Sequence, residues 1–300
     1  MLKLLNKIKN EVKEMADTIV RAVTKDSNFR AIAMDGTQML QKASKFHQAT
    51  PLGVEILGKA LISSLLVANA VLKGEERLAV TLDGQGPAGK IVIEASATGL
   101  VRGYVANPQV LADSVPAGVG TDGFLQITKE MDEESKPFTS SVQLANGRID
   151  DDFTYYMLTS EQIPSVVMAR VKIDADGQVE AAGGVIVSAL PDVKEDALKQ
   201  FYAAVDQMPD IADLLMKNHA PLDLLSPLFG VGQVKQLSIE EVNLYPDITK
   251  SDYARMLGTL QVSQLQEMID DDQGAEIVDR FTGNKIQFST AELQSILEQQ

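Results

Sequence analysis

Residues 78–110, LAVTLDGQGPAGKIVIEASATGLVRGYVANPQV, decide the fold and read as three β-strands joined by two turns. The strands are LAVTLD, KIVIEAS and LVRGYV, and β-branched residues dominate the first two. The first break, residues 84–89, holds three glycines and a proline, and the second, residues 97–99, is short and ends on glycine. These short connections predict a meander that forms the start of a larger sheet.

The first break also matches a nucleotide-binding pattern. Gly84, Gly86 and Gly89 spell G-x-G-x-x-G after a strand. In a dinucleotide site a helix opens at that loop, so that its N-terminal amides meet the pyrophosphate. Here the strand residues 91–93 follow and Pro87 lies inside the loop, so we interpret the glycines as a tight connection within the sheet.

Composition excludes several classes of function. The chain has 300 residues, 45% of them hydrophobic, which is enough for a large buried core. A net charge of -15 repels phosphates, which argues against a nucleic-acid partner or an anionic membrane. There is no cysteine, so disulfides, thiolate nucleophiles and thiolate zinc sites are excluded. Only His47 and His219 supply imidazole, too few for a multi-histidine metal site.

No secretory signal is visible at the N-terminus. Residues 1–15 carry apolar side chains at helical spacing with four interspersed lysines, which predicts an extra amphipathic helix over residues 1–16. We favour packing of this helix on the body over binding to a membrane surface. The apolar stretch 56–72 is interrupted by polar residues and is expected to fall short of a membrane span. We therefore expect no stable membrane insertion and a cytoplasmic location.

The rest of the chain mixes helices and strands. Strands are expected within residues 17–36 and at 123–129, 137–143, 166–171 and 179–190, and residues 108–120 are expected to form a loop. Helices are expected at 37–47, 52–72 and 149–161, and short ones over 192–228, divided by Pro209 and Pro221. We interpret the Asp150–Asp152 run as a helix cap in preference to a divalent-metal site, because it lacks the spaced oxygens and glycine of a calcium loop.

A family resemblance rests on three blocks of sequence. Residues 46–110, which begin FHQATPLGVEILGKAL and contain GQGPAGKI and GLVRGYVANP, resemble the thirty-three-kilodalton heat-shock family of redox-regulated bacterial holdase chaperones. TYYMLTSEQIPSVV and VEAAGGVIVSALP match two further blocks. The resemblance runs from about residue 17 to the end. It implies an α+β fold: a core domain over 17–190, a helical linker region over 191–242, and a small C-terminal unit over 243–300.

In the family, the C-terminal unit holds zinc through four cysteines, and their oxidation releases the metal and unfolds the tail and linker. The resemblance places the first cysteine pair at Pro246 and Ile248 and the second at Asp279 and Thr282. Proline and isoleucine offer no ligand atom, so we expect no zinc, no other cofactor and no redox switch of the family kind.

Without a metal, the C-terminal unit must fold around hydrocarbon. The residues expected to form this core are Ile248, Leu257, Ile269, Ile277, Phe281, Ile286, Phe288, Leu293 and Ile296. Two outcomes stay open: a marginal, mostly open tail that gives a constitutive or heat-activated holdase, or a well-packed cap.

The leading functional hypothesis is an ATP-independent holdase that binds unfolding client proteins. Its candidate client-binding or linker surface comprises Val234, Leu237, Ile239, Val242 and Leu244. Homodimers occur in the family, and an exposed sheet edge would permit one here. The alternatives are a family-derived protein-interaction module and, less well supported, a hydrolytic enzyme. The last lacks a G-x-S-x-G motif and a histidine near a Ser–Asp pair, so we expect no catalytic residue.

Overall fold

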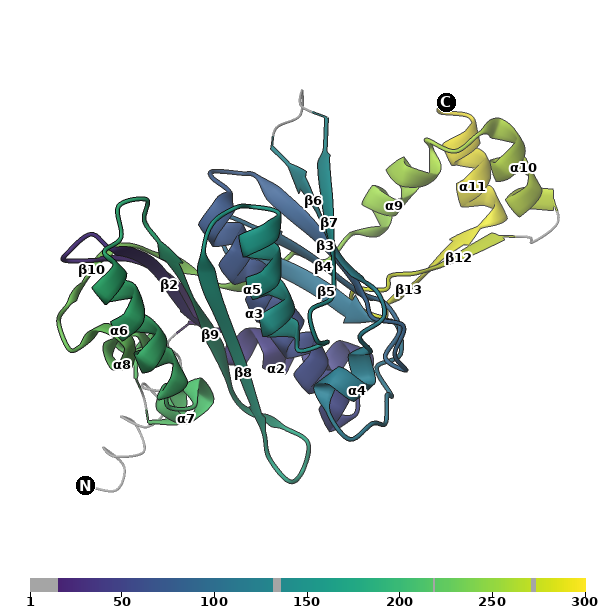
Figure 1. Cartoon of the computed structure of the whole chain (residues 1–300). Helices are drawn as coiled ribbons and strands as arrows, with labels where there is room; N and C mark the ends of the chain where they lie inside the picture. The colour runs from purple at the N-terminus through teal and green to yellow at the C-terminus, as the bar shows by residue number, and fades with distance from the viewer. Residues whose placement is uncertain (1–15, 132–135, 218, 271–273) are drawn as a thin grey trace, which may run out of the picture. The chain divides into compact units, whose positions relative to one another are not determined.

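The computed structural model describes residues 16–131, 136–217, 219–270 and 274–300. The chain divides into two compact units, one reaching to Leu244 and the other spanning Tyr245–Gln300. The amphipathic helix expected over residues 1–16 falls almost wholly outside the described residues. Helices and sheets alternate along the first unit (Figure 1), in agreement with the predicted α+β class.

The first sheet of this unit has five antiparallel strands in the order β10-β1-β2-β9-β8. Its strands are β1 (Thr18–Thr24), β2 (Phe29–Asp35), β8 (Ser165–Ile173), β9 (Val179–Ala189) and β10 (Val234–Glu241). Gly184 on β9 allows a close approach, because a Cβ there would lie 2.5 Å from the carbonyl oxygen of Met168. β10 joins this sheet from far along the chain, so the segment expected to be linker forms an edge strand.

The second sheet has six strands in the order β11-β5-β4-β3-β6-β7. They are β3 (Arg77–Asp83), β4 (Ile91–Ser96), β5 (Leu100–Val105), β6 (Phe124–Glu130), β7 (Phe138–Gln143) and β11 (Asn243–Leu244). β3, β4 and β5 are paired antiparallel in sequence order, so the predicted meander is confirmed.

The glycine-rich loop between β3 and β4 packs on a short helix, α4 (Val115–Val119), where the sequence predicted only a loop. Gly86 N–H donates to the carbonyl oxygen of Val119, and Ala88 N–H donates to that of Gly118, each at 2.9 Å. A Cβ on Gly86 would lie 2.4 Å from the backbone of Val119. The glycines therefore permit close backbone contact within the sheet, and no helix opens at this loop.

Two helices, α2 (Thr37–His47) and α3 (Pro51–Val71), follow β2. α3 lies between the two sheets (Figure 1), and 16 of its 21 residues are buried. Thr50 caps it by accepting a hydrogen bond from Gly53 N–H at 3.1 Å. Among the described residues, α3 alone is long and apolar enough to cross a membrane, so the expectation that this stretch falls short is wrong for length and composition. However, 83% of the 18-residue window that meets this criterion is buried inside the fold, as in a core helix.

Four short helices cover the other face of the five-stranded sheet. These cover helices are α6 (Glu195–Asp206), α7 (Ile211–Met216), the 3-10 helix η2 (Pro221–Leu225) and α8 (Ser226–Phe229). The breaks predicted at Pro209 and Pro221 lie between them. The region expected to be a helical linker thus packs on the first unit.

The C-terminal unit contains three helices and a hairpin among the residues described. They are α9 (Lys250–Leu257), α10 (Val262–Asp270), β12 (Gly274–Val278), β13 (Lys285–Ser289) and α11 (Thr290–Leu297). Thr249 caps α9 and Ser289 caps α11, and each forms a capping box with the acid three residues later.

Asp17, which precedes β1, caps helix α2 through its side chain. The residue is 4% exposed, and its carboxylate accepts hydrogen bonds from the backbone N–H groups of Gln38 (3.1 Å) and Met39 (2.6 Å), in the first turn of α2. The N-cap of α2, Gly36, has no side chain to do so. Burial outweighs these hydrogen bonds and raises the pKa of Asp17 to about 7.

Asp17 should make the stability of the first unit depend on pH. Between its usual pKa of 3.8 and about 7, the folded protein holds a proton on Asp17 that the unfolded chain has released. The free energy of unfolding therefore falls as the pH rises through this range. Asp17→Asn removes the titration. The difference in unfolding free energy between the two proteins should shift by about 1.4 kcal/mol per pH unit. Urea titrations at several pH values across this range measure it, and a difference independent of pH would contradict the assignment.

Candidate functional site

The five residues predicted to form a client-binding surface differ in their exposure to solvent. Leu237 and Ile239 are exposed on β10, at 57% and 56%. Val242 is buried in the core between the sheets, and Leu244 packs against that core. Val234 packs under the cover helices. Only Leu237 and Ile239 therefore present large apolar side chains to solvent.

A larger apolar surface lies beneath the cover helices, and the sequence-based reasoning did not identify it. The outer face of the five-stranded sheet contributes Ala22, Phe29, Ala31, Ala33, Met168, Ala181, Val185 and Val187 to one buried cluster. Phe201 of α6 and Phe229 of α8 pack on Phe29, with ring centroids 4.9 and 5.5 Å from its own. The nearly continuous apolar run of β9, AAGGVIV, was the available signal, since such runs are typical of strands buried on both faces.

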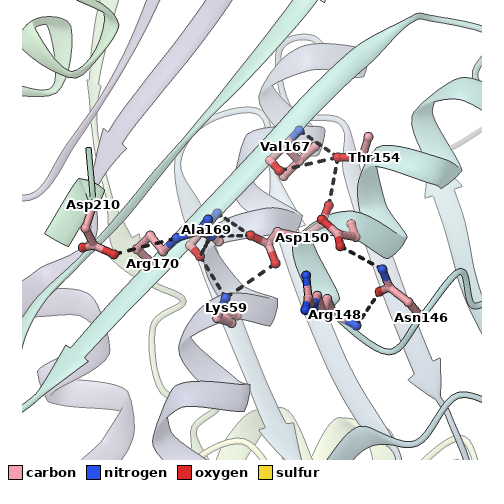
Figure 2. Close-up of polar contacts among 10 residues, drawn as sticks. Lys59, Asn146, Arg148, Asp150, Thr154, Val167, Ala169, Arg170 and Asp210 are labelled. Atoms are coloured by element: carbon pink, nitrogen blue, oxygen red, sulfur yellow. Dashed lines mark hydrogen bonds and ion pairs between the residues drawn. The ribbon is translucent and has the colours of Figure 1, made fainter. Parts of the chain in front are cut away.

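Asp150 joins three elements at the border of the cover helices (Figure 2). It lies in the first turn of α5 (Ile149–Thr159), and its carboxylate contacts Lys59 of α3 at 3.5 Å and Arg170 of β8 at 2.5 Å. The guanidinium of Arg170 also lies 3.8 Å from the carboxylate of Asp210, which caps α7. Arg170 therefore links the sheet and α5 to the cover helices.

The interpretation of Asp150–Asp152 as a helix cap needs correction. All three lie in the first turn of α5, where negative charge is favoured, but no side chain caps this helix. Asp152 instead accepts hydrogen bonds from the backbone N–H groups of Ala145 (2.7 Å) and Asn146 (3.1 Å). Burial, which is the largest influence, raises the pKa of Asp152. Asp152 thus stabilises the preceding turn, and Asp150 links α5 to α3 and β8.

A cavity of about 330 Å³ lies beside Arg170, between α5, β8 and the α6–α7 junction. Its titratable lining groups are Asp150, Asp151, Arg170 and Asp210, and its apolar lining includes Val166 and Met208. None of these groups is a nucleophile activated by a neighbouring base. Over the described ranges, no three His, Asp or Glu side chains are grouped to hold a metal ion.

The hairpin of the C-terminal unit is closed by Asp279, one of the four positions predicted to stand in place of zinc ligands. Asp279 is 6% exposed, and its carboxylate accepts hydrogen bonds from Phe281 N–H (2.8 Å) and the hydroxyl of Thr282 (2.9 Å). Its backbone pairs across the turn, with Asp279 N–H donating to Asn284 O and Gly283 N–H donating to Asp279 O. A carboxylate and a hydroxyl therefore hold the turn at the two positions where the family resemblance predicted lost zinc ligands.

The other two aligned positions differ from each other. Ile248 packs against the apolar cluster of the C-terminal unit, whereas Pro246 is exposed. The buried members of that cluster are Tyr253, Leu257, Leu265, Ile269, Phe288 and Leu293. Of the nine residues predicted for this core, eight belong to the cluster or pack on it. Phe281 does not appear in it, and Tyr253 and Leu265 were not predicted.

Comparisons with known proteins agree over almost the whole chain. A family model described as Hsp33 protein matches residues 17–289. The 33 kDa chaperonin of Lactiplantibacillus plantarum is 39% identical over 290 residues, which cover 94% of this chain and 98% of the relative. That of Staphylococcus carnosus is 36% identical with the same coverage. The crystal structure of the 33 kDa chaperonin from Thermotoga maritima matches with a TM-score of 0.83 and 28% identity, over 95% of this chain and 98% of that one.

Replacing Asp279 should open the C-terminal hairpin. Asp279→Ala leaves a partly buried N–H and a partly buried hydroxyl without their acceptor, which should cost about 1–3 kcal/mol of local stability. Hydrogen exchange of residues 274–289, followed by mass spectrometry, should become faster accordingly. Asp279→Asn keeps an acceptor oxygen and should retain most of the protection. Asp247→Ala, at an exposed site of the same unit, is the control, and equal exchange in the two alanine variants would contradict the role of Asp279.

Proposed function

Because the chain belongs to the Hsp33 family of chaperones, we propose that it is an ATP-independent holdase, which binds unfolding proteins and prevents their aggregation without a switch based on cysteine oxidation. Its partners are unfolded or partly folded proteins, and its place of action is the cytoplasm. Catalysis and a cofactor are not required for this activity.

The observation that carries this proposal is the apolar outer face of the five-stranded sheet. A holdase needs an apolar surface that can be exposed on a highly charged body. The cover helices shield such a surface and are themselves short. α6 buries only Phe201 among its 12 residues. Lifting these helices would present Phe29, Val185 and Val187 to a client.

The polar contacts that hold the cover helices are weak individually. Lys172 of β8 pairs with Asp213 of α7 at 2.6 Å, with both side chains about half exposed. Exposed pairs of this kind contribute about 0–1 kcal/mol. The contact between Arg170 and Asp210, at 3.8 Å, is longer still. Release of the cover by heat or by a competing client is therefore compatible with an intact sheet beneath it.

Two features support independence from ATP and from thiols. Residues 84–90 spell G-x-x-x-x-G-K, but Ile91 stands where a phosphate-binding loop has Ser or Thr, and β4 follows instead of a helix. The 300 residues contain no cysteine, so no oxidant can form a disulfide within the chain. The net charge of -15 would keep complexes with clients dispersed.

Light scattering of a heat-labile, cysteine-free client tests this function. We expect the protein to suppress the client's aggregation to the same degree with and without diamide, a thiol oxidant, and with and without ATP. A heat-stable protein of similar net charge is the control for charge alone. Suppression that requires diamide would contradict the redox independence. A lack of suppression at every temperature below the protein's own unfolding would contradict the holdase and leave an interaction module.

A further inference from the structure

Strand β10 has a free side. It lies at the end of the five-stranded sheet and pairs with β1 alone among the described strands. Val242 N–H donates to Asp17 O at 2.8 Å, so these two residues form a hydrogen-bonded pair just beyond the strand. Bonded and non-bonded pairs alternate in an antiparallel ladder, and Ile239 lies opposite Val20, three positions on. The backbone N–H and C=O of Ile239 therefore point away from β1.

The two exposed apolar side chains of β10 lie on this same free stretch. Ile239 is 56% exposed and Leu237 is 57% exposed. The register shifts at Arg21 and Ala22, which leaves Leu237 without an opposite residue on β1. A bulge of this kind blunts a sheet edge, so the usable ladder centres on Ile239. It ends at Glu241, whose carbonyl lies against Gly99.

The two ends of β10 carry opposite charges. Lys235 is exposed near its start and Glu241 is exposed at its end. Glu240 is held by Arg21 at 2.8 Å, whereas no ion pair joins Glu241 to the part of the chain described. An antiparallel partner strand would begin beside Glu241, so it would be favoured by a basic residue at its N-terminal end.

The charge of the whole molecule separates two occupants. A second copy of this chain would bring the Lys235 of its own β10 near Glu241, but it carries another net charge of -15, and the two molecules would repel each other as a whole. An unfolded segment with lysine or arginine would instead be attracted. Strand addition uses main-chain hydrogen bonds, which every extended polypeptide offers, so it suits a protein that binds many clients.

We propose that β10 binds a short extended segment of an unfolded protein as an additional antiparallel strand. The backbone of Ile239 pairs with the segment, Leu237 and Ile239 contact its apolar side chains, and a lysine or arginine at its N-terminal end lies near Glu241. This mode of binding rests on the holdase function proposed above and adds a site that stays available while the cover helices are closed.

The test uses the full chain and fluorescent peptides, read by fluorescence anisotropy. The probe has two N-terminal lysines followed by alternating valine and threonine, with both termini blocked. One control peptide has the lysines at the C-terminal end, and another has a proline at its centre. We expect the probe to bind about tenfold more tightly than either control. Equal binding of the probe and the proline peptide would overturn pairing through the backbone.

Three variants locate the site. Ile239→Pro removes the free N–H at a position that does not bond to β1, and Ile239→Gln replaces the apolar side chain with a polar, uncharged one while keeping the N–H. Both should weaken binding of the probe, by about tenfold or more for proline. Val231→Lys, at an 87% exposed site outside the strand, should change it little. Unchanged affinity in Ile239→Pro would overturn the site.

Two further results separate this site from the other possibilities. If the parent protein binds the peptide and Ile239→Pro does not, but the parent fails to suppress client aggregation, the edge site is supported and the holdase function is contradicted. If suppression persists while no peptide binds β10, the holdase stands and the edge site fails. Sedimentation of the parent protein as a dimer that Ile239→Pro dissociates would overturn the client segment in favour of a second copy.

Discussion

The first unit depends on the burial of one helix, α3, between two sheets. Sixteen of its 21 residues are buried, and they contact strands of both sheets. Gly58 allows close packing there, because a Cβ would lie 2.4 Å from the side chain of Leu40 and force that side chain to move. Among the polar side chains of α3, Lys59 contacts Asp150 and donates a hydrogen bond to the carbonyl oxygen of Ala169.

The two sheets differ in the polarity of the face that points away from α3. The six-stranded sheet is apolar toward α3 and partly polar on its other side, where Glu94 and Arg102 pair across neighbouring strands. The five-stranded sheet is apolar on both sides, so its outer face needs the cover helices. That asymmetry leaves an extensive apolar face of this sheet buried beneath the cover helices. The proposed client binding would use this sheet in preference to the other.

The described part of the C-terminal unit is held by an apolar cluster and a hydrogen-bonded turn. In a zinc-bound fold, metal binding supplies much of the folding free energy. Here an apolar cluster around Leu265 and Leu293 supplies burial, with Ile248 packed against it, and Asp279 closes the hairpin through hydrogen bonds. Neither contribution depends on oxidation state, so under the proposed function a trigger would act on packing or on charge.

Much of the fold could be predicted from local sequence, because the meander at 78–105 and helix α3 have strong periodic patterns. α4 was missed because Pro116, Gly118 and Gly120 indicate a loop, while its cap, Ser114, is a weak signal. The partners of Asp150 could not be predicted, since Lys59 lies 91 residues away along the chain. The segment of β10 was expected to be linker, and nothing in its sequence indicated an edge position in the five-stranded sheet. The family resemblance itself is confirmed, whereas Asp279 and Thr282 were read only as lost ligands.

Hydrogen exchange of residues 245–300 in the intact protein tests most directly whether the C-terminal unit stays folded without a metal ion and without thiols. Exchange is compared in buffer, with a strong zinc chelator, and with chelator plus diamide, using β1 as an internal reference. Equal protection of α9, α10 and α11 in all three conditions is the predicted result. Loss of that protection on adding the chelator or the oxidant, with β1 unchanged, would contradict a hydrocarbon core closed by Asp279.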